Sequence, residues 1–71
     1  MDYKKLKLRI KEIYDVQPQL SFADAMEMSP TALNLRLNNK TQWKTPEIIK
    51  ACELLNIPLE EAHTYFFNQK L

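Results

Sequence analysis

Apolar residues recur at intervals of three and four along most of this chain, which is the spacing of one face of an α-helix. The pattern predicts a first helix over about residues 2–15. Its apolar face consists of Tyr3, Leu6, Ile10, Ile13 and Tyr14. Asp2 is placed to cap the first turn. The helix is expected to end before Pro18, because the residue that precedes a proline avoids the α region.

A second, shorter helix is predicted over about residues 21–26. Ser21 and Asp24 have the spacing of a capping box at its start. The residues expected to face inward are Phe22, Ala23 and Met26. A joint of three residues, 27–29, leads to the next helix.

The third helix is predicted to open with Ser29 as its N-cap and Pro30 as its first residue. Leu33 and Leu37 lie one turn apart and mark its buried side. The helix is expected to stop near residues 38–39, since asparagine tolerates the left-handed conformation that ends many helices.

A fourth helix is predicted from Thr45, as its cap, and Pro46, as its first residue. Its inner stripe consists of Ile48, Ile49, Cys52 and Leu55. The preceding loop, residues 40–44, carries Trp43. We expect this indole to brace the loop against the core, because its burial removes a large apolar area from water. The alternative is that it flanks a bound phosphate.

A fifth helix is predicted to open at Pro58, with Glu60 and Glu61 in the first turn, where the helix dipole favours acidic groups. Its apolar side consists of Leu59, Ala62, Tyr65, Phe66 and Phe67. The three aromatic residues cannot all turn inward on one helix. A homodimer through this helix, or a contact of this helix with another protein, is therefore predicted. The alternative is that the tail wraps over the first helix.

No stretch alternates apolar and polar residues for long enough to predict a strand, so the expected fold class is all-α, with five short helices in one domain, residues 1–71. Of the 71 residues, 45% are hydrophobic and 27% are charged, which suits a compact domain. Glycine is absent, which excludes glycine-rich phosphate loops. The single cysteine and the lack of a long apolar run predict a cytoplasmic protein with no metal, cofactor or membrane contact.

Catalytic chemistry is not expected from this sequence. His63 is the only histidine, and no cluster of acids or sulfur ligands accompanies it. Cys52 lies on an apolar stripe without a base to activate it. The side chains of Glu60 and Glu61 diverge by about 100° on a helix and cannot act as a pair. We therefore predict that the protein is not an enzyme and takes no small-molecule substrate.

The two helices within about residues 21–38 have the spacing of a helix-turn-helix motif, with the small Ala23 where they approach most closely. The run at residues 19–33 (QLSFADAMEMSPTAL), with LNLRLNNK and ACELLNIP further on, resembles Cro/CI-type regulators of temperate phages. Short Cro-like proteins and modulators of repression are the members it resembles most. The resemblance implies a lambda-repressor-like fold and a place in the cytoplasm of a bacterial host.

That resemblance further implies a transcriptional regulator of a lysis–lysogeny switch, which binds operator DNA with the helix at residues 29–38 in the major groove. The residues that match contact positions of the family are Gln19, Ser29, Thr31 and Asn34. Arg36, Lys40 and Lys44 are expected to clamp a phosphate. Leu35 and Asn38 complete the predicted contact set.

A second function stays open, that of an antirepressor which binds the phage repressor protein directly. The formal net charge is only +1, which is low for a protein that neutralises phosphates. Glu27 occupies the turn position where the family usually has glycine and where a positive φ is expected. Leu35 would point outward. Acidic groups near the motif, such as Asp24, would attract the basic DNA-binding surface of a repressor.

Overall fold

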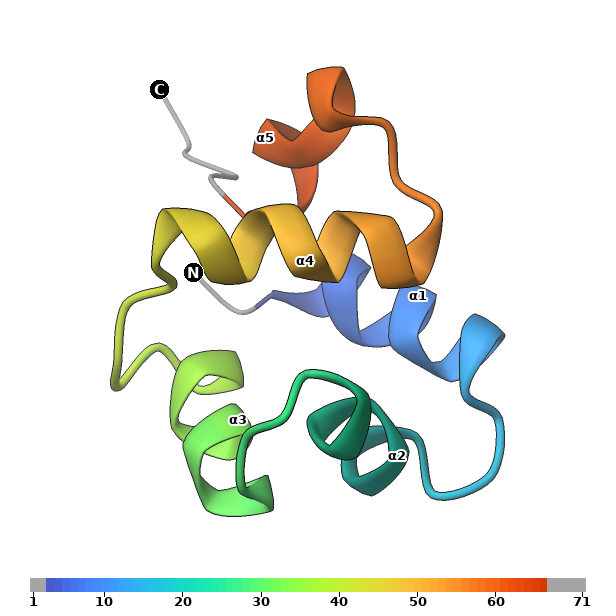
Figure 1. Ribbon diagram of the computed structural model, residues 1–71, viewed down its shortest axis with the longest axis vertical. Coiled ribbons are helices and arrows are strands. Elements are labelled where there is room, and N and C mark those ends of the chain that lie inside the picture. Colours follow the sequence, from blue (N-terminus) through green and yellow to red (C-terminus); the bar gives the residue numbers. More distant parts are fainter. Residues whose placement is uncertain (1–2, 67–71) are drawn as a thin grey trace.

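A computed structural model describes residues 3–66 of the chain (Figure 1). Its elements are α1 (Lys4–Ile13), α2 (Pro18–Ala25), α3 (Pro30–Leu37), α4 (Thr45–Leu55), the 3-10 turn η1 (Leu59–Glu61) and α5 (Ala62–Phe66). No strand occurs in this part of the chain, so the all-α prediction is confirmed for it. The predicted cap Asp2 and the aromatic Phe67 lie outside the described residues.

The helices surround one apolar core, with α1 at its centre. In Figure 1, α1 passes behind α4, the α2–α3 pair lies below them, and α5 lies above. The α1 helix contacts α2, α4 and α5, and α2 also contacts α3. The side chains with almost no exposed surface come from α1 to α4 and are Leu6, Ile10, Phe22, Leu33, Leu37, Cys52 and Leu55. The inward orientation predicted for the α2 residues is confirmed by Phe22, Ala23 and Met26.

The starts of α2 and α4 differ from the prediction, whereas the start of α3 agrees with it. Pro18 is the first residue of α2 and does not merely end the preceding helix. Ser21 consequently lies inside α2, and its hydroxyl donates a hydrogen bond to the Val16 carbonyl at 2.8 Å instead of capping. Lys44, not Thr45, is the N-cap of α4. A proline is tolerated anywhere in the first turn, so it locates a helix start only to within a few residues.

Three helices end in the same way without any glycine. A residue with a left-handed backbone follows each helix, two residues after the end of α2 and α3 and one after the end of α4. The φ angles are 61° at Glu27, 62° at Asn39 and 56° at Asn56. The following amide then reaches back to the helix. The Met28 N–H donates to the Ala23 carbonyl at 3.0 Å, and the corresponding bonds of α3 and α4 are 2.8 and 2.9 Å. These are Schellman-type ends, which confirm the predicted stop of α3 and the positive φ expected at Glu27.

Three residues assigned to apolar stripes are exposed. Ile13, Ile49 and Leu59 expose 37%, 41% and 61% of their surface. Ile49 is turned about 100° from Ile48, so it lies at the border of the buried face of α4, and Ala51 takes the inner position. Leu59 belongs to a 3-10 turn, in which the spacing of an α-helix does not apply. Ile13 lies in the last turn of α1, at the edge of the core.

Replacing Glu27 with glycine should stabilise the protein. A side chain with a Cβ in the left-handed region costs about 1 kcal/mol, which glycine avoids. Chemical denaturation should show a higher free energy of unfolding for Glu27→Gly by about 0.5–1 kcal/mol. Glu27→Ala is the matched control, because it removes the same carboxylate and keeps the Cβ. If Glu27→Ala stabilised the protein equally, the gain would come from the lost charge and not from the backbone.

Candidate interaction surface on α3

The α3 helix and its C-cap present four outward side chains at helical spacing. Its inner side is defined by Leu33 and Leu37, which are 0% and 1% exposed. At about 100° per residue, the opposite side carries a fixed set of side chains. They are Thr31, Asn34, Leu35 and Asn38, all exposed. Of the contact residues predicted on α3 and at its C-cap, these four therefore share one face, and Arg36 does not.

Two asparagines on this face are joined to each other. The Asn38 side-chain N–H donates to the Asn34 carbonyl at 2.9 Å and also to Asn34 Oδ1. These bonds hold both amides against the helix. The Asn34 NH₂ group and one lone pair of its Oδ1 remain for a ligand, so the side chain still offers a donor beside an acceptor.

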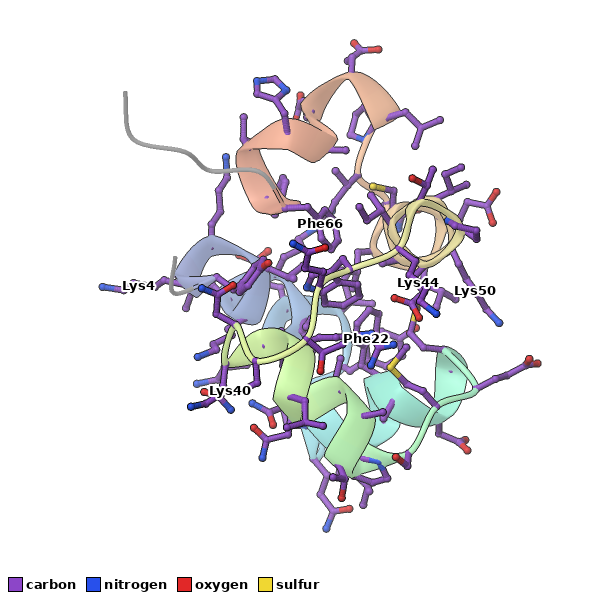
Figure 2. The ribbon with its side chains drawn as sticks, turned by 90° about the vertical axis from the view of Figure 1, so that its left-hand side faces the viewer. Lys4, Phe22, Lys40, Lys44, Lys50 and Phe66 are labelled. Carbon is purple, nitrogen blue, oxygen red and sulfur yellow. The ribbon has the colours of Figure 1, made fainter. Side chains whose placement is uncertain are left out.

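The other predicted contact residues lie around α3. Gln19 is exposed in the first turn of α2. Ser29 caps α3, since its Oγ accepts a hydrogen bond from the Ala32 N–H at 3.0 Å. Lys40 and Lys44 are exposed, and in Figure 2 they lie well apart, with Lys40 after α3 and Lys44 at the start of α4. The structure does not bring these two lysines together as a clamp on one phosphate.

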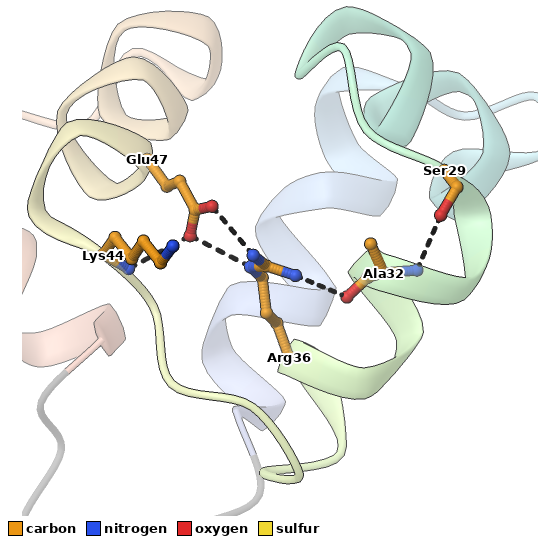
Figure 3. A network of polar contacts seen from close by, with 5 residues as sticks. All are labelled: Ser29, Ala32, Arg36, Lys44 and Glu47. Atoms are coloured by element: carbon orange, nitrogen blue, oxygen red, sulfur yellow. Dashed lines mark hydrogen bonds and ion pairs between the residues drawn. The ribbon is translucent and has the colours of Figure 1, made fainter.

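Arg36 is held inside the protein and does not point to solvent. Its guanidinium donates to both carboxylate oxygens of Glu47, at 2.9 and 2.8 Å, and to the Ala32 carbonyl at 3.0 Å (Figure 3). The exposed fractions of the Arg36 and Glu47 side chains are 12% and 21%. This pair joins α3 to the first turn of α4. The predicted phosphate contact of Arg36 conflicts with this placement, because its donors are occupied by a carboxylate.

Glu47 was not singled out from the sequence, and it has two roles. It binds Arg36, and its Oε1 also accepts the Lys44 backbone N–H at 3.0 Å, which caps α4. The hydrogen bond from Arg36 is the largest cause that lowers the pKa of Glu47 below its usual value of 4.5, and it outweighs partial burial, which raises the pKa. The Lys44 backbone N–H and then the charges of Arg36 and Lys44 lower the pKa further. The signal available in the sequence was an acid three residues after the cap, the second half of a capping box.

The loop between α3 and α4 is braced by Trp43, as predicted. The indole ring lies 5.0 Å from Phe66 and 6.4 Å from Tyr3, in edge-to-face arrangements. Its Nε1 is buried without a hydrogen-bond partner among the described residues. Burial also raises the pKa of the Tyr3 hydroxyl. The loop that leads from α3 is thus fixed to both ends of the described chain.

Two of the three C-terminal aromatic residues, Tyr65 and Phe66, are described, and both pack against the protein itself, so the homodimer through α5 stays a prediction. Phe66 is only 3% exposed and belongs to the core. Tyr65 is half-buried, and Lys5 Nζ lies 4.6 Å from the centre of its ring. Lys5 also donates to the Thr64 hydroxyl at 3.2 Å. Within the described residues, α5 is therefore covered by α1 of the same chain, and Phe67 lies outside them.

The two residues considered for catalysis, Cys52 and His63, lie in different surroundings. Cys52 is buried in the core, and burial raises the pKa of its thiol. His63 is exposed. Residues 3–66 contain no group of histidine, cysteine and acidic side chains that would hold a metal ion. The prediction that the protein is not an enzyme stays a prediction.

The protein is thus a small helical protein in which the Arg36–Glu47 ion pair holds the exposed polar helix α3 in place. A family model, described as Protein of unknown function (DUF739), matches residues 1–69, so the chain belongs to the DUF739 family. No curated protein matches the sequence. In the described part of the chain, every helix is too short or too polar to cross a bilayer.

Replacing Glu47 with glutamine should make the protein less sensitive to acid. A carboxyl group with a lowered pKa in the folded state stabilises the protein above about pH 4.5, and this contribution is lost as the pH falls through the folded-state pKa. Glu47→Gln should reduce the free energy of unfolding at neutral pH by about 1–2 kcal/mol, because the partly buried Arg36 loses its charged partner. As the pH falls from about 5 to about 3, the free energy of unfolding of Glu47→Gln should then decrease less than that of the wild type.

The measurement is chemical denaturation at a series of pH values. Glu53→Gln is the matched control, since Glu53 is an exposed carboxylate on the same helix with no ion pair inside residues 3–66. Equal acid sensitivity in the wild type and Glu47→Gln would contradict the role given to this pair.

Proposed function

We propose that the protein is a transcriptional regulator of a phage-type lysis–lysogeny switch, which binds operator DNA through a helix-turn-helix formed by α2 and α3. The observation that carries the proposal is the outward face of α3, where Thr31, Asn34 and Asn38 are exposed beside the capped start of the helix. A helix of this kind enters the major groove, and the residues near its N-terminus contact base edges.

Each contact residue has a distinct task in this proposal. Asn34 reads an adenine through its amide donor and acceptor, a pairing worth about 1–3 kcal/mol of discrimination. Thr31 contacts a neighbouring base edge. Gln19 and the cap Ser29 lie beside the backbone of the duplex. Lys40 neutralises a phosphate after the helix.

Arg36 acts on DNA only indirectly in this proposal. Its bonds to Glu47 and Ala32 hold α3 against α4, and they set the angle at which α3 is presented. The net charge of +1 and the internal pairing of Arg36 leave few cations for phosphates. We therefore expect modest affinity and a shallow dependence of binding on salt concentration.

The alternative is an antirepressor that binds the phage repressor protein and alters its grip on DNA. Leu35 favours this function, because it is 42% exposed at the middle of the outward face, where a base-reading residue would be polar. Asp24 and Glu27 are also exposed around the α2–α3 turn. Their carboxylates repel phosphates and attract the basic surface with which a repressor binds DNA.

Selection of DNA from a pool of random duplexes by the purified protein distinguishes the two functions. Direct binding predicts one enriched motif and its specific retardation in a gel at moderate salt. The antirepressor predicts no enrichment by this protein alone, and release or altered retardation of DNA when the repressor encoded beside it is added. Absence of both results would reject both functions.

Asn34→Ala and Lys40→Ala should affect DNA binding in different ways. Asn34→Ala should relax the preference at one base pair by about 1–3 kcal/mol, whereas Lys40→Ala should weaken binding to all sequences and reduce the salt slope by about one. The measurement is a titration of matched and singly mismatched duplexes at several salt concentrations. Lys5→Ala is the charge-matched control, because Lys5 contacts Thr64 and Tyr65 on α5, at the other end of the fold from α2 and α3, and it should bind like the wild type.

Leu35→Glu tests the proposed protein contact of the α3 face. A buried apolar anchor contributes much more to a protein interface than to a DNA surface, so the substitution should abolish capture of the repressor if the antirepressor function holds. Leu8→Glu is the control, because Leu8 is 54% exposed on α1. Equal loss of repressor binding in both variants would show that charge, not the α3 face, is responsible.

A further inference from the structure

A groove with a volume of about 510 Å³ lies between the second half of α1, the start of α2 and the end of α3. Its apolar lining consists of Ile10, Pro18, Leu20 and Leu37. Leu20 is 50% exposed there, so an apolar ligand would remove substantial leucine surface from water. None of the residues in this lining belongs to the outward face of α3.

One wall of the groove carries an unpaired positive charge. Lys7 and Lys11 line it and lie one turn apart on α1. Neither ammonium group forms an ion pair within residues 3–66. The opposite wall is the first turn of α2, which has no side-chain cap. An apolar floor between such walls favours an aliphatic side chain that is flanked by carboxylates.

The η1 turn of this protein carries an aliphatic side chain with two carboxylates beside it. Leu59 is 61% exposed, the second most exposed of the large apolar residues described. Glu60 and Glu61 follow it, both exposed and without an ion pair among the described residues. In a 3-10 turn successive side chains point about 120° apart, so the leucine protrudes with a carboxylate on either side.

These two features cannot meet within one molecule. In Figure 1, η1 lies at the upper end of the fold above α4, whereas α2 lies at the lower end. The helices between them form one packed core. The contact is therefore available only between two molecules.

We propose that the η1 turn, Leu59–Glu61, of one copy docks into the α1–α2 groove of a second copy. Leu59 enters the apolar floor against Leu20, and the carboxylates of the turn face Lys7 and Lys11. The contact area of one such turn is small, so the association is weak and is populated at high micromolar to millimolar concentration. It differs from the α5 dimer predicted from the sequence.

Charge reversal with complementation tests this contact in the full chain. Sedimentation equilibrium of the wild type, up to millimolar concentration, should show a weight-average mass above that of the monomer. Lys7→Glu with Lys11→Glu, and separately Glu60→Lys with Glu61→Lys, should each weaken self-association about tenfold or more through like-charge contacts. An equimolar mixture of the two double variants should associate again, because each supplies the charge that the other has lost.

Two further variants make the result specific to these surfaces. Leu59→Ala should weaken self-association without a change of charge, and Glu53→Lys, a reversal elsewhere on the surface, should associate like the wild type. Far-ultraviolet circular dichroism checks that each variant keeps its helices. A wild type that stays monomeric at millimolar concentration overturns the proposal, as does a mixture that fails to associate. A wild type that stays monomeric but binds an acidic peptide from another protein would assign the groove to that partner instead. None of these outcomes depends on DNA binding, so the proposed regulatory function is tested separately.

Discussion

The bidentate ion pair between Arg36 and Glu47 fixes the orientation of α3 relative to α4. It connects the middle of α3 to the first turn of α4, and the same carboxylate caps α4 through the Lys44 amide. An ion pair with this geometry resists rotation of α3 about its axis, because both N–H groups of the guanidinium must stay in line with the carboxylate. The polar face of α3 is therefore presented at one fixed angle relative to α4, as the proposed docking of this helix would require.

A second constraint is the absence of glycine, because three helices end with a left-handed residue. Asparagine takes this position after two of them and glutamate after the third. Asn39 and Asn56 end α3 and α4 in the left-handed conformation at modest cost. Glu27 does the same after α2 with a larger side chain, and Lys50 approaches its carboxylate at 3.6 Å. The turn between α2 and α3 is thus held by a residue poorly suited to its backbone. Such positions persist where the surrounding packing over-determines them.

The exposed groups divide into two surfaces with different chemistry. The outward face of α3 is polar apart from Leu35, and it suits a ligand read by hydrogen bonds. The α1–α2 groove is apolar between positive walls, and it suits a leucine with acidic neighbours. Gln19 lines the groove and is also a proposed DNA contact. A molecule docked in the groove would therefore lie beside the proposed DNA surface. The core takes only a few residues from each helix, so the remaining faces of the helices can form two separate surfaces.

The sequence by itself determined the features that depend on neighbours along the chain. The helical class, the Ser29 cap, the left-handed stop of α3 and the outward side chains of α3 all follow from local spacing and local hydrogen bonds. Only the tertiary structure decided that Arg36 binds Glu47, that Ile49 and Leu59 stay exposed, and that Phe66 enters the core instead of a dimer surface. These outcomes depend on which elements approach one another in space. Periodicity gives the direction of a side chain around its own helix, but the neighbour that covers it comes from a distant part of the chain.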